Sequence, residues 1–336
     1  MTLDVAVFST RAYDRDALDR AVDAAEADIG LRYFEARLTA DTVGLAEGCG
    51  AVCVFVNDDV DAEAVNRLRN QGVRGIVTRS AGFNHIDLDA AENAGLPVLR
   101  VPAYGPRGVA EHALALMMTL NRRTHRAFNR TREGNFNLEG LLGFEMHGKT
   151  AGVVGTGLIG SAMCDILLGL GCDVLAFDTS PSDTLREKGV RFVELDDLWP
   201  ACDIVTLHCP LLDSTRHLIN TDTLDRLPDH AMVINTSRGG LVDTRAALSA
   251  LREKRLGALG IDVYEEEEGL FFEDHGTDGL TDELLAQLVA LPDVLVTGHQ
   301  AFFTREAVDR IATTTVNNLA AIANNSVDEQ DTRVKP

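Results

Sequence analysis

Two series of short, nearly continuous apolar runs, separated by segments with helical spacing of their apolar residues, constrain the fold of this chain most. The first series includes "DVAVFS" at 4–9, "AVCVFV" at 51–56, "RGIVT" at 74–78 and "LPVLRV" at 96–101. The second includes "TAGVVG" at 150–155, "DVLAFD" at 173–178, "DIVTLH" at 203–208, "AMVINT" at 231–236, "GALGIDV" at 257–263 and "DVLVTG" at 293–298. Apolar strands alternating with helices are typical of parallel sheets covered on both faces. The sequence therefore predicts an α/β protein with two doubly wound, Rossmann-like parallel-sheet domains.

The second series contains a glycine-rich turn between a strand and a helix. Gly155, Gly157 and Gly160 form the pattern G-x-G-x-x-G, and Asp178 ends the next strand. In such a turn the first glycine permits the tight bend, the second lets backbone N–H groups approach a pyrophosphate, and the third allows close helix–strand packing. Asp178 can accept hydrogen bonds from ribose hydroxyls, and its charge would repel a 2′-phosphate. These residues predict a dinucleotide site that prefers NAD to NADP.

The position of this turn predicts how the domains are connected. Because the turn begins only after about 150 residues, the first strand series is expected to form a separate domain. One long helix is expected to begin near Pro106, and an amphipathic helix is expected over 304–325. We predict a discontinuous substrate domain of 1–103 plus 304–336, an NAD-binding domain of 104–303, and an active-site cleft between them. The polar tail from about Ser326 is expected to be disordered.

Composition argues against several partners and compartments. The 336 residues carry a formal net charge of -21, which disfavours nucleic acid and anionic membranes. No segment has the length and hydropathy of a membrane span or a secretory leader. The six cysteines form no C-x-x-C pair, so reduced thiols in a cytoplasmic protein are expected. The acidic, lysine-poor composition would also suit a salty cytoplasm.

One local basic segment is an exception to this charge. The stretch "NRRTHRAFNRTR" at 121–132 holds five arginines and one phenylalanine. It could bind nucleic acid, but the acidic remainder of the chain would repel phosphate. A helix face or a contact between subunits is the favoured interpretation.

Three later segments place reactive groups where strands end, and ligands bind at that edge of open parallel sheets. They are "INTSRGG" with Arg238, "GIDVYEEEEG" with Asp262 and four glutamates, and "VLVTGHQAFF" with His299. With these motifs, the chain resembles the D-isomer-specific 2-hydroxyacid dehydrogenases, most closely the fermentative D-lactate dehydrogenases among them. The resemblance extends over nearly the whole chain and includes "SAGFNHID" at 80–87, "VPAYGPRGVAEHA" at 101–113, "LHCPL", "NTSRGGLVD", "DVYEEE" and "TGHQAFFT".

The resemblance implies a role for individual residues. Arg238 would bind the substrate carboxylate and carbonyl oxygen, His299 would be the acid/base, and Glu267 would pair with His299. The implied cofactor contacts are Gly155, Gly157, Leu158, Ile159, Gly160, Asp178, Cys209, Pro210, Thr215, Thr236, Ser237 and Asp262. Family members often carry asparagine at the position of Thr215, so this contact departs from the pattern. The implied substrate contacts are Ala81, Gly82, Tyr104, Arg238 and Phe302.

The residue chemistry agrees with these implied roles. Reduction of a 2-oxo acid needs a hydride donor, a proton donor near neutral pH and a cation for the carboxylate. Histidine can supply the proton, and arginine offers a planar fork for a carboxylate. His208 also follows a strand and is the rival to His299, but we interpret it as a loop residue beside the cofactor. Asp87, Glu111 and His112 are expected to orient helices and loops.

The sequence leaves three alternatives for function. The favoured one is an NAD-dependent D-lactate dehydrogenase that reduces pyruvate. A close variant would reduce a larger 2-oxo acid, and a more distant one is a nucleotide-sensing corepressor or scaffold on the same fold. A homodimer or homotetramer is expected, and no metal ion is expected because the hydride reaction needs none. Of the four glutamates, only Glu267 is expected to take part in chemistry, whereas Glu265, Glu266 and Glu268 are not.

Overall fold

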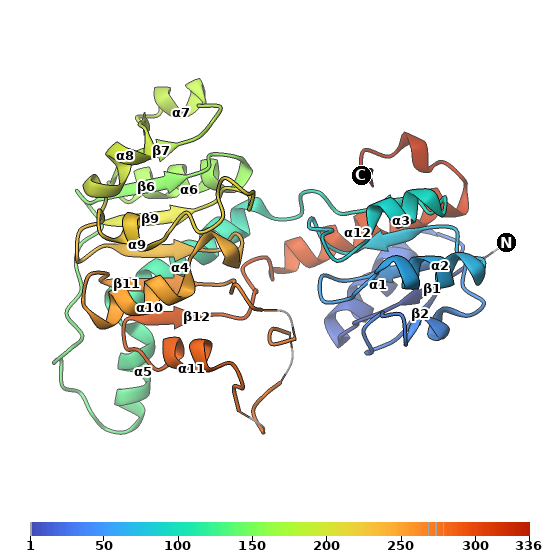
Figure 1. The fold of residues 1–336 in the computed structure, drawn as a ribbon, viewed down its shortest axis with the longest axis horizontal. Helices are drawn as coiled ribbons and strands as arrows, with labels where there is room; N and C mark the ends of the chain where they lie inside the picture. The colour runs from blue at the N-terminus through green and yellow to red at the C-terminus, as the bar shows by residue number, and fades with distance from the viewer. Residues whose placement is uncertain (1, 268, 273, 278) are drawn as a thin grey trace. The chain divides into compact units, whose positions relative to one another are not determined.

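The chain divides into two compact units, Met1–Gly105 with Phe303–Pro336 and Pro106–Phe302, which we call unit 1 and unit 2 (Figure 1). The computed structural model describes residues 2–267, 269–272, 274–277 and 279–336. Each unit contains one sheet of mostly or entirely parallel strands covered by helices, which confirms the predicted fold class. The domain boundaries expected from the sequence were 1–103 plus 304–336 for the substrate domain and 104–303 for the NAD-binding domain.

Unit 1 is built on a six-stranded sheet in the order β13-β5-β4-β3-β1-β2. All of its pairs are parallel except β13 with β5. Its strands are β1 (Leu3–Val7), β2 (Ile29–Tyr33), β3 (Ala51–Val54), β4 (Ile76–Thr78), β5 (Val98–Leu99) and β13 (Arg333–Val334). Its helices are α1 (Ala12–Ala25), η1 (Val43–Ala46), α2 (Ala62–Asn70), α3 (Leu88–Asn93), α12 (Arg305–Ala323) and η4 (Val327–Glu329).

The first strand shows why this sheet is buried on both faces. Val5 and Val7 point into the cluster formed with α1 and α12, whereas Ala6 and Phe8 point into the cluster formed with α2 and α3. Successive side chains of a strand point to opposite faces, so an uninterrupted apolar run supplies both clusters. The run of apolar residues in the sequence is therefore the direct cause of the layered architecture.

The end of the chain differs from the sequence-based expectation. The tail after Ser326 was expected to be disordered, but residues 327–329 form η4 and residues 333–334 form β13. Arg333 pairs with Leu99 and Val334 with Val98, in antiparallel register. The prediction was wrong because it relied on polar composition, whereas a strand at the edge of a sheet is specified mainly by backbone hydrogen bonds to its neighbour.

Unit 2 is built on a seven-stranded parallel sheet in the order β12-β11-β10-β9-β6-β7-β8. Its strands are β6 (Thr150–Val154), β7 (Asp173–Phe177), β8 (Arg191–Phe192), β9 (Ile204–Leu207), β10 (Met232–Asn235), β11 (Ala258–Ile261) and β12 (Val294–Val296). Its longer helices are α4 (Pro106–Arg122), α5 (Thr124–Arg132), α6 (Leu158–Gly169), α10 (Thr244–Arg252) and α11 (Glu283–Val289). Its shorter ones are α7 (Asp183–Glu187), α8 (Leu195–Leu198), η2 (Trp199–Ala201), α9 (Thr221–Leu224) and η3 (Gly239–Leu241).

The helices of unit 2 cover both faces of its sheet. Apolar residues of α4 and α6 pack on one face, and those of α9, α10 and α11 pack on the other, where Figure 1 shows α9 and α10 in front of the strands. Because the strands are parallel, their carboxyl ends meet at one edge, and the loops that leave this edge carry the candidate site residues. Among the described residues, no helix is long and apolar enough to cross a membrane.

Candidate active site

The turn between β6 and α6 contains three glycines with different physical roles. Gly155 has a φ of 89°, and a Cβ added there would lie 2.6 Å from the backbone nitrogen of Cys209. A Cβ on Gly160 would lie 1.9 Å from the carbonyl oxygen of Gly155. Around Gly157, an added Cβ would meet no atom within 4 Å. The protein's own packing therefore requires Gly155 and Gly160, whereas Gly157 leaves the space in front of α6 open.

The start of α6 fits a dinucleotide pyrophosphate. Gly157 is the N-cap and provides no side-chain hydrogen bond, so the first N–H groups of the helix are available to a ligand. Leu158, the first helical residue, is 69% exposed, and Ile159 follows it. A helix start with open space and uncapped N–H groups is suited to an anion.

Asp178 follows β7 and is held in place by the glycine turn. Its carboxylate accepts hydrogen bonds from the backbone nitrogen and hydroxyl of Thr156, at 2.6 and 3.0 Å, and from the backbone nitrogen of Ser180 at 2.8 Å. Partial burial raises the pKa of Asp178, but these hydrogen bonds together outweigh burial and leave the pKa below its usual value. The group is therefore an ionised acceptor at neutral pH beside the open end of α6, as ribose binding requires.

The loops after β9 and β10 contact one another beside this turn. Ser237 donates its hydroxyl to the carbonyl oxygen of Cys209 at 2.7 Å. The hydroxyl of Thr236 is buried and has no hydrogen-bond partner among the described residues, so it can serve a ligand. The hydroxyl of Thr215, by contrast, donates to the carbonyl oxygen of Pro210 at 2.7 Å. Thr215 thus closes its own loop, which weakens the case for it as a direct cofactor contact.

Asp262, after β11, supports the loop that carries His299. Its fully buried carboxylate accepts hydrogen bonds from Gln300 N at 2.9 Å, from Ala301 N at 2.7 Å and from the Thr297 hydroxyl. His112 of α4 lies 3.4 Å from the same carboxylate and 3.1 Å from the Thr297 hydroxyl. These contacts make Asp262 an anchor for residues 297–301, and its contact with the nicotinamide stays a prediction.

His299 lies on this anchored loop in an unusual backbone conformation. Its φ is 52°, a left-handed value that costs energy in a residue with a side chain and is found preferentially at functional sites. The backbone nitrogen of His299 donates to the carbonyl oxygen of Asp262 at 2.7 Å. The ring nitrogen Nδ1 lies 2.9 Å from Oε1 of Glu267. Among the described residues Nε2 has no partner, so it is the nitrogen that can exchange a proton with a ligand.

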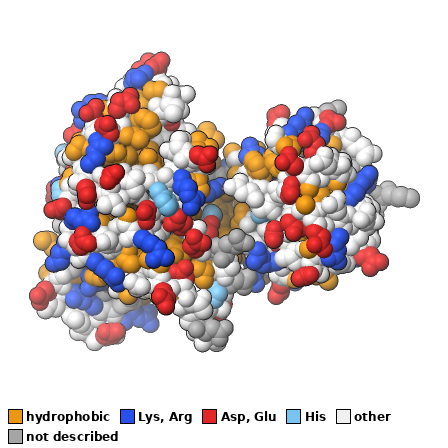
Figure 2. All heavy atoms as spheres, viewed as in Figure 1, with side chains coloured by type: hydrophobic (Ala, Val, Ile, Leu, Met, Phe, Trp, Pro, Cys, Tyr) orange, Lys and Arg blue, Asp and Glu red, His pale blue; other side chains and the backbone are white. Residues whose placement is uncertain are grey.

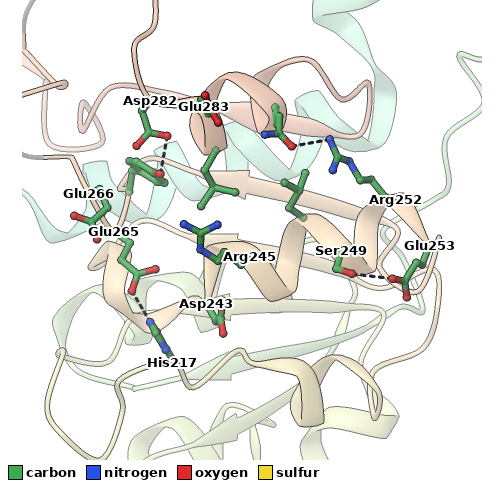
Figure 3. Close-up of a pocket in the computed structure, with 14 residues that line it drawn as sticks. His217, Asp243, Arg245, Ser249, Arg252, Glu253, Glu265, Glu266, Asp282 and Glu283 are labelled. Atoms are coloured by element: carbon green, nitrogen blue, oxygen red, sulfur yellow. Dashed lines mark hydrogen bonds and ion pairs between the residues drawn. The ribbon is translucent and has the colours of Figure 1, made fainter.

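The glutamates that follow Tyr264 point in different directions. Glu267 faces His299, and its second oxygen accepts the backbone N–H of Tyr264 at 3.0 Å. Glu265 instead lies 2.5 Å from His217 Nε2 and 3.5 Å from Arg216. Glu265 and Glu266 line a pocket beside α10 and α11, and Arg245 and Asp282 line it too (Figure 3). The expectation for Glu268 lies outside the described residues.

Glu265 is thus an ion-pair partner, which the sequence did not reveal. Its contacts connect the loop after β11 to the segment before α9. This function is structural and does not contradict the expectation that Glu265 does no chemistry. No local signal could have identified it, because His217 is distant from Glu265 in the sequence.

Arg238 follows β10, and most of its donors have no partner among the residues that the structure describes. Nη1 donates to the carbonyl oxygen of Ser237 at 2.7 Å, and among the described residues Arg238 bonds neither Glu267 nor His299. The next residue, Gly239, packs tightly on the peptide between Tyr264 and Glu265, since a Cβ there would lie 2.1 Å from the carbonyl carbon of Tyr264. The loops that carry Arg238 and Glu267 are therefore in direct backbone contact.

The remaining substrate candidates are distributed between the units. Ala81 and Gly82 follow β4 in unit 1, and Tyr104 precedes α4, with its carbonyl oxygen 2.8 Å from Arg310 Nη1. Phe302 is the last residue of unit 2. The contact of these residues with substrate stays a prediction.

The surroundings of His208 and Asp87 show which functions these two residues can perform. Burial lowers the pKa of His208 to about 4, so this histidine is neutral at physiological pH and is unsuited to proton donation. Asp87 caps α3 by accepting the N–H of Ala90 at 2.8 Å, which is an orienting function. Phe272, which the sequence did not single out, places its ring 5.7 Å from that of His299. Within the described part of the chain, no three His, Cys, Asp or Glu side chains are arranged to hold a metal ion.

Comparison with known proteins identifies the family. Residues 114–301 match the model of the D-isomer specific 2-hydroxyacid dehydrogenase, NAD binding domain. The chain is 49% identical over 318 residues to D-lactate dehydrogenase of Escherichia coli (strain K12), which covers 95% of this chain and 96% of that protein. The structure of the pyruvate reductase of Chlamydomonas reinhardtii matches with a TM-score of 0.91 and 44% identity, over 96% of this chain and 97% of that one.

A further structural match shows how broad the family is. The structure of D-2-hydroxyisocaproate dehydrogenase has a TM-score of 0.87 and 27% identity, over 99% of this chain and 100% of that one. The family match covers more than half of the chain, and it coincides with the unit that contains the glycine turn, Asp178, Arg238, Glu267 and His299. The chain therefore belongs to the D-isomer specific 2-hydroxyacid dehydrogenase family, whose matched domain binds NAD.

Proposed function

We propose that this protein is a D-lactate dehydrogenase that reversibly reduces pyruvate to D-lactate with NADH. The observation that supports this most is the hydrogen-bonded pair of Glu267 and His299, at 2.9 Å, in which Nε2 of the histidine has no partner among the described residues. Similarity to D-lactate dehydrogenase of Escherichia coli over 95% of the chain supports the choice of substrate. A scaffold protein would not need a proton donor held in a strained backbone conformation.

The proposed mechanism assigns one task to each side chain. The glycine turn at 155–160 and Asp178 would hold NADH, which when bound would supply the hydride for a new C–H bond at C2 of pyruvate. His299 donates the Nε2 proton to the carbonyl oxygen as the C=O π bond breaks, so the product is a neutral hydroxyl group. Glu267 stabilises the positively charged ring before that transfer and fixes its orientation. Arg238 binds the carboxylate through its guanidinium fork and polarises the carbonyl.

The cofactor is expected to be NADH rather than NADPH. Asp178 is ionised and is followed by Thr179 and Ser180 rather than by an arginine, so a 2′-phosphate would meet a negative charge and lose the ribose hydrogen bonds. We expect kcat/KM to be about a hundredfold higher with NADH. Asp178→Asn should narrow this ratio, whereas Asp183→Asn on α7 should leave it unchanged. Equal kcat/KM values for the two cofactors in the unaltered protein would refute the role of Asp178.

The substrate is expected to be small. The resemblance to the family implies that Tyr104 and Phe302 each place a ring beside the methyl group of the substrate. A branched 2-oxo acid would have to displace a ring, and such overpacking costs about 1–3 kcal/mol. NADH oxidation should be measured with a panel of 2-oxo acids, with chiral analysis of the products. Faster reduction of 2-oxoisocaproate than of pyruvate would assign the protein to the alternative with a larger substrate, and absence of any turnover would favour a nucleotide-sensing scaffold.

The four glutamates should have different effects on the pH dependence of the reaction. Reduction needs protonated His299 and oxidation needs the neutral ring. Removing the charge of Glu267 destabilises the protonated ring, so Glu267→Gln should make pyruvate reduction fade at lower pH and let lactate oxidation persist to lower pH. The measurement is kcat/KM against pH in both directions.

Three matched variants serve as controls for this pH experiment. Glu265→Gln, Glu266→Gln and Glu268→Gln should leave both pH profiles in place. Glu265→Gln should change only the melting temperature, which should fall because the substitution weakens the ion pair with His217. Profiles that stay unchanged in Glu267→Gln, or that move in Glu266→Gln, would contradict the assignment.

We also propose a homodimer or homotetramer in the cytoplasm, with no nucleic-acid or membrane partner. Four exposed apolar side chains lie within residues 128–142, in α5 and the segment after it: Phe128, Phe136, Leu138 and Leu142, which are 60%, 75%, 80% and 91% exposed. Apolar exposure of this extent favours a subunit contact.

All six cysteines are free and buried, which suits a reducing compartment. On the face shown in Figure 2, lysine and arginine side chains are scattered among acidic ones, so this face offers no continuous basic surface for a nucleic acid or an anionic membrane.

A further inference from the structure

The loop after β4 presents three successive peptide groups in a controlled orientation. The carbonyl oxygen of Ser80 accepts the N–H of Val101 at 3.0 Å. That of Ala81 accepts Nη1 of Arg100 at 3.1 Å, and that of Gly82 accepts the hydroxyl of Ser80 at 2.6 Å. In a planar trans peptide, the N–H points away from the C=O. The N–H groups of the next three residues therefore point away from these donors.

These three N–H groups are available to a ligand. They belong to Ala81, Gly82 and Phe83, and within the described residues none of them donates a hydrogen bond. All three residues are partly exposed, and they lie at the carboxyl end of a parallel strand. Successive free N–H groups can donate hydrogen bonds to an anion. This inference rests on the proposed function, which requires a site for the carboxylate of a 2-oxo acid.

The Gly82 carbonyl is held by a chain of side-chain hydrogen bonds. Ser80 gives its only hydroxyl proton to Gly82, so Thr78, at 2.7 Å, must donate to Ser80. The Thr78 hydroxyl then accepts from Nε2 of His85 at 3.3 Å. Burial lowers the pKa of His85 to about 4, so the ring is neutral and its single N–H can occupy Nε2. The direction of every bond in this chain is thereby fixed.

Within the part of the chain that the structure describes, the Ala81 carbonyl accepts a hydrogen bond from Arg100 alone. The guanidinium of Arg100 also stacks on the ring of Phe83, at 5.3 Å from the ring centroid, so one side chain holds both ends of the three-residue segment. The backbone of Arg100 is anchored in turn. Its N–H donates to the carbonyl oxygen of Thr332 and its carbonyl accepts Nδ2 of buried Asn318, both at 3.0 Å.

We propose that Arg100 is a positioning residue for the substrate carboxylate, acting through the Ala81–Gly82 peptide. Its bond to the Ala81 carbonyl turns the Gly82 N–H toward the ligand. Its positive charge also polarises this peptide, which makes the N–H a stronger donor to an anion. Arg100 thus affects substrate binding, whereas proton transfer is the task of His299.

The test compares Arg100→Met, which keeps the aliphatic stem but has no donor, with Arg100→Lys, which keeps the charge. In Arg100→Met the KM for pyruvate should rise about tenfold, while kcat and the KM for NADH stay within about twofold. The inhibition constant of oxamate, which has an NH2 group in place of the methyl group of pyruvate, should rise in parallel. Arg100→Lys should recover part of the loss.

The matched control is Arg32→Met in the same unit. Arg32 also donates to a backbone carbonyl, that of Glu47, at 2.8 Å, but it lies on the edge strand β2. Its loss should leave the KM for pyruvate unchanged, and melting temperatures of all variants should be measured alongside.

Each outcome bears on a separate claim. A wild-type KM in an active Arg100→Met variant, or a fall in kcat with no change in KM, would overturn the role of Arg100 and leave the proposed function intact. If the unaltered protein prefers another 2-oxo acid, the same comparison is made with that acid, because the carboxylate is common to the class. If the unaltered protein reduces no 2-oxo acid and does not bind oxamate, both the proposed function and this inference fail.

Discussion

Replacing His299 with asparagine is expected to lower kcat for pyruvate reduction by about 10³–10⁴-fold, near the upper end of what general acid catalysis contributes. The variant lacks a proton donor at the position of Nε2. Asparagine is chosen because it tolerates left-handed backbone angles, and His299 has a φ of 52°. NADH binding, followed by fluorescence titration, should change little.

The chain offers a closely matched control for this variant. His217 also has a left-handed φ, of 50°, and its ring also contacts a glutamate, Glu265. His217→Asn should leave kcat within about threefold of the unaltered value. Loss of less than tenfold in His299→Asn, or an equal loss in His217→Asn, would remove His299 from the proposed role.

Replacing Arg238 with glutamine is expected to lower kcat/KM for pyruvate by at least about a hundredfold. Two hydrogen bonds to a charged carboxylate are lost, and each contributes about 1.5–3 kcal/mol. Arg238→Lys should have intermediate activity, because a lysine keeps the charge but not the planar fork. Added guanidinium ion should restore part of the activity of Arg238→Gln.

The control for Arg238 is another exposed arginine of unit 2. Arg216→Gln removes a cation that lies 3.5 Å from Glu265, and it should leave kcat/KM within about threefold. A fall of equal size in both variants would indicate a general loss of positive charge rather than carboxylate binding by Arg238.

Local patterns were sufficient to predict the layered fold and the glycine turn. Central strands such as β6 and β9 are apolar runs, and Gly155 and Gly160 act within a few residues of their own positions. Strands β2, β8 and β13 were not predicted. They contain Arg32, Arg191 and Arg333, so they lack a continuous apolar run, and their pairing with a neighbouring strand determines their conformation.

Local sequence patterns could not predict the contacts in the candidate site between residues that are distant in the sequence. The sequence names Asp262 as a reactive group, but its buried position beneath the loop of residues 297–301 depends on how β11 and β12 pair. The contact of Glu265 with His217 likewise requires the folded sheet to bring two loops together. The resemblance to the family located Glu267 and His299, and their spacing in the sequence alone would not have paired them.

The discontinuous unit 1 has a consequence for the order in which the molecule is made. A ribosome supplies β1 to β5 first, yet the apolar face that includes Val5 and Val77 is covered partly by Leu319 and other residues of α12. That helix is synthesised only after the whole of unit 2, which is one uninterrupted stretch and can fold during translation. Helix α1 lies on the same face and is made early, so only the part that α12 covers in the folded protein stays without a covering segment until residues 305–323 emerge. That part is the surface left for chaperones to shield.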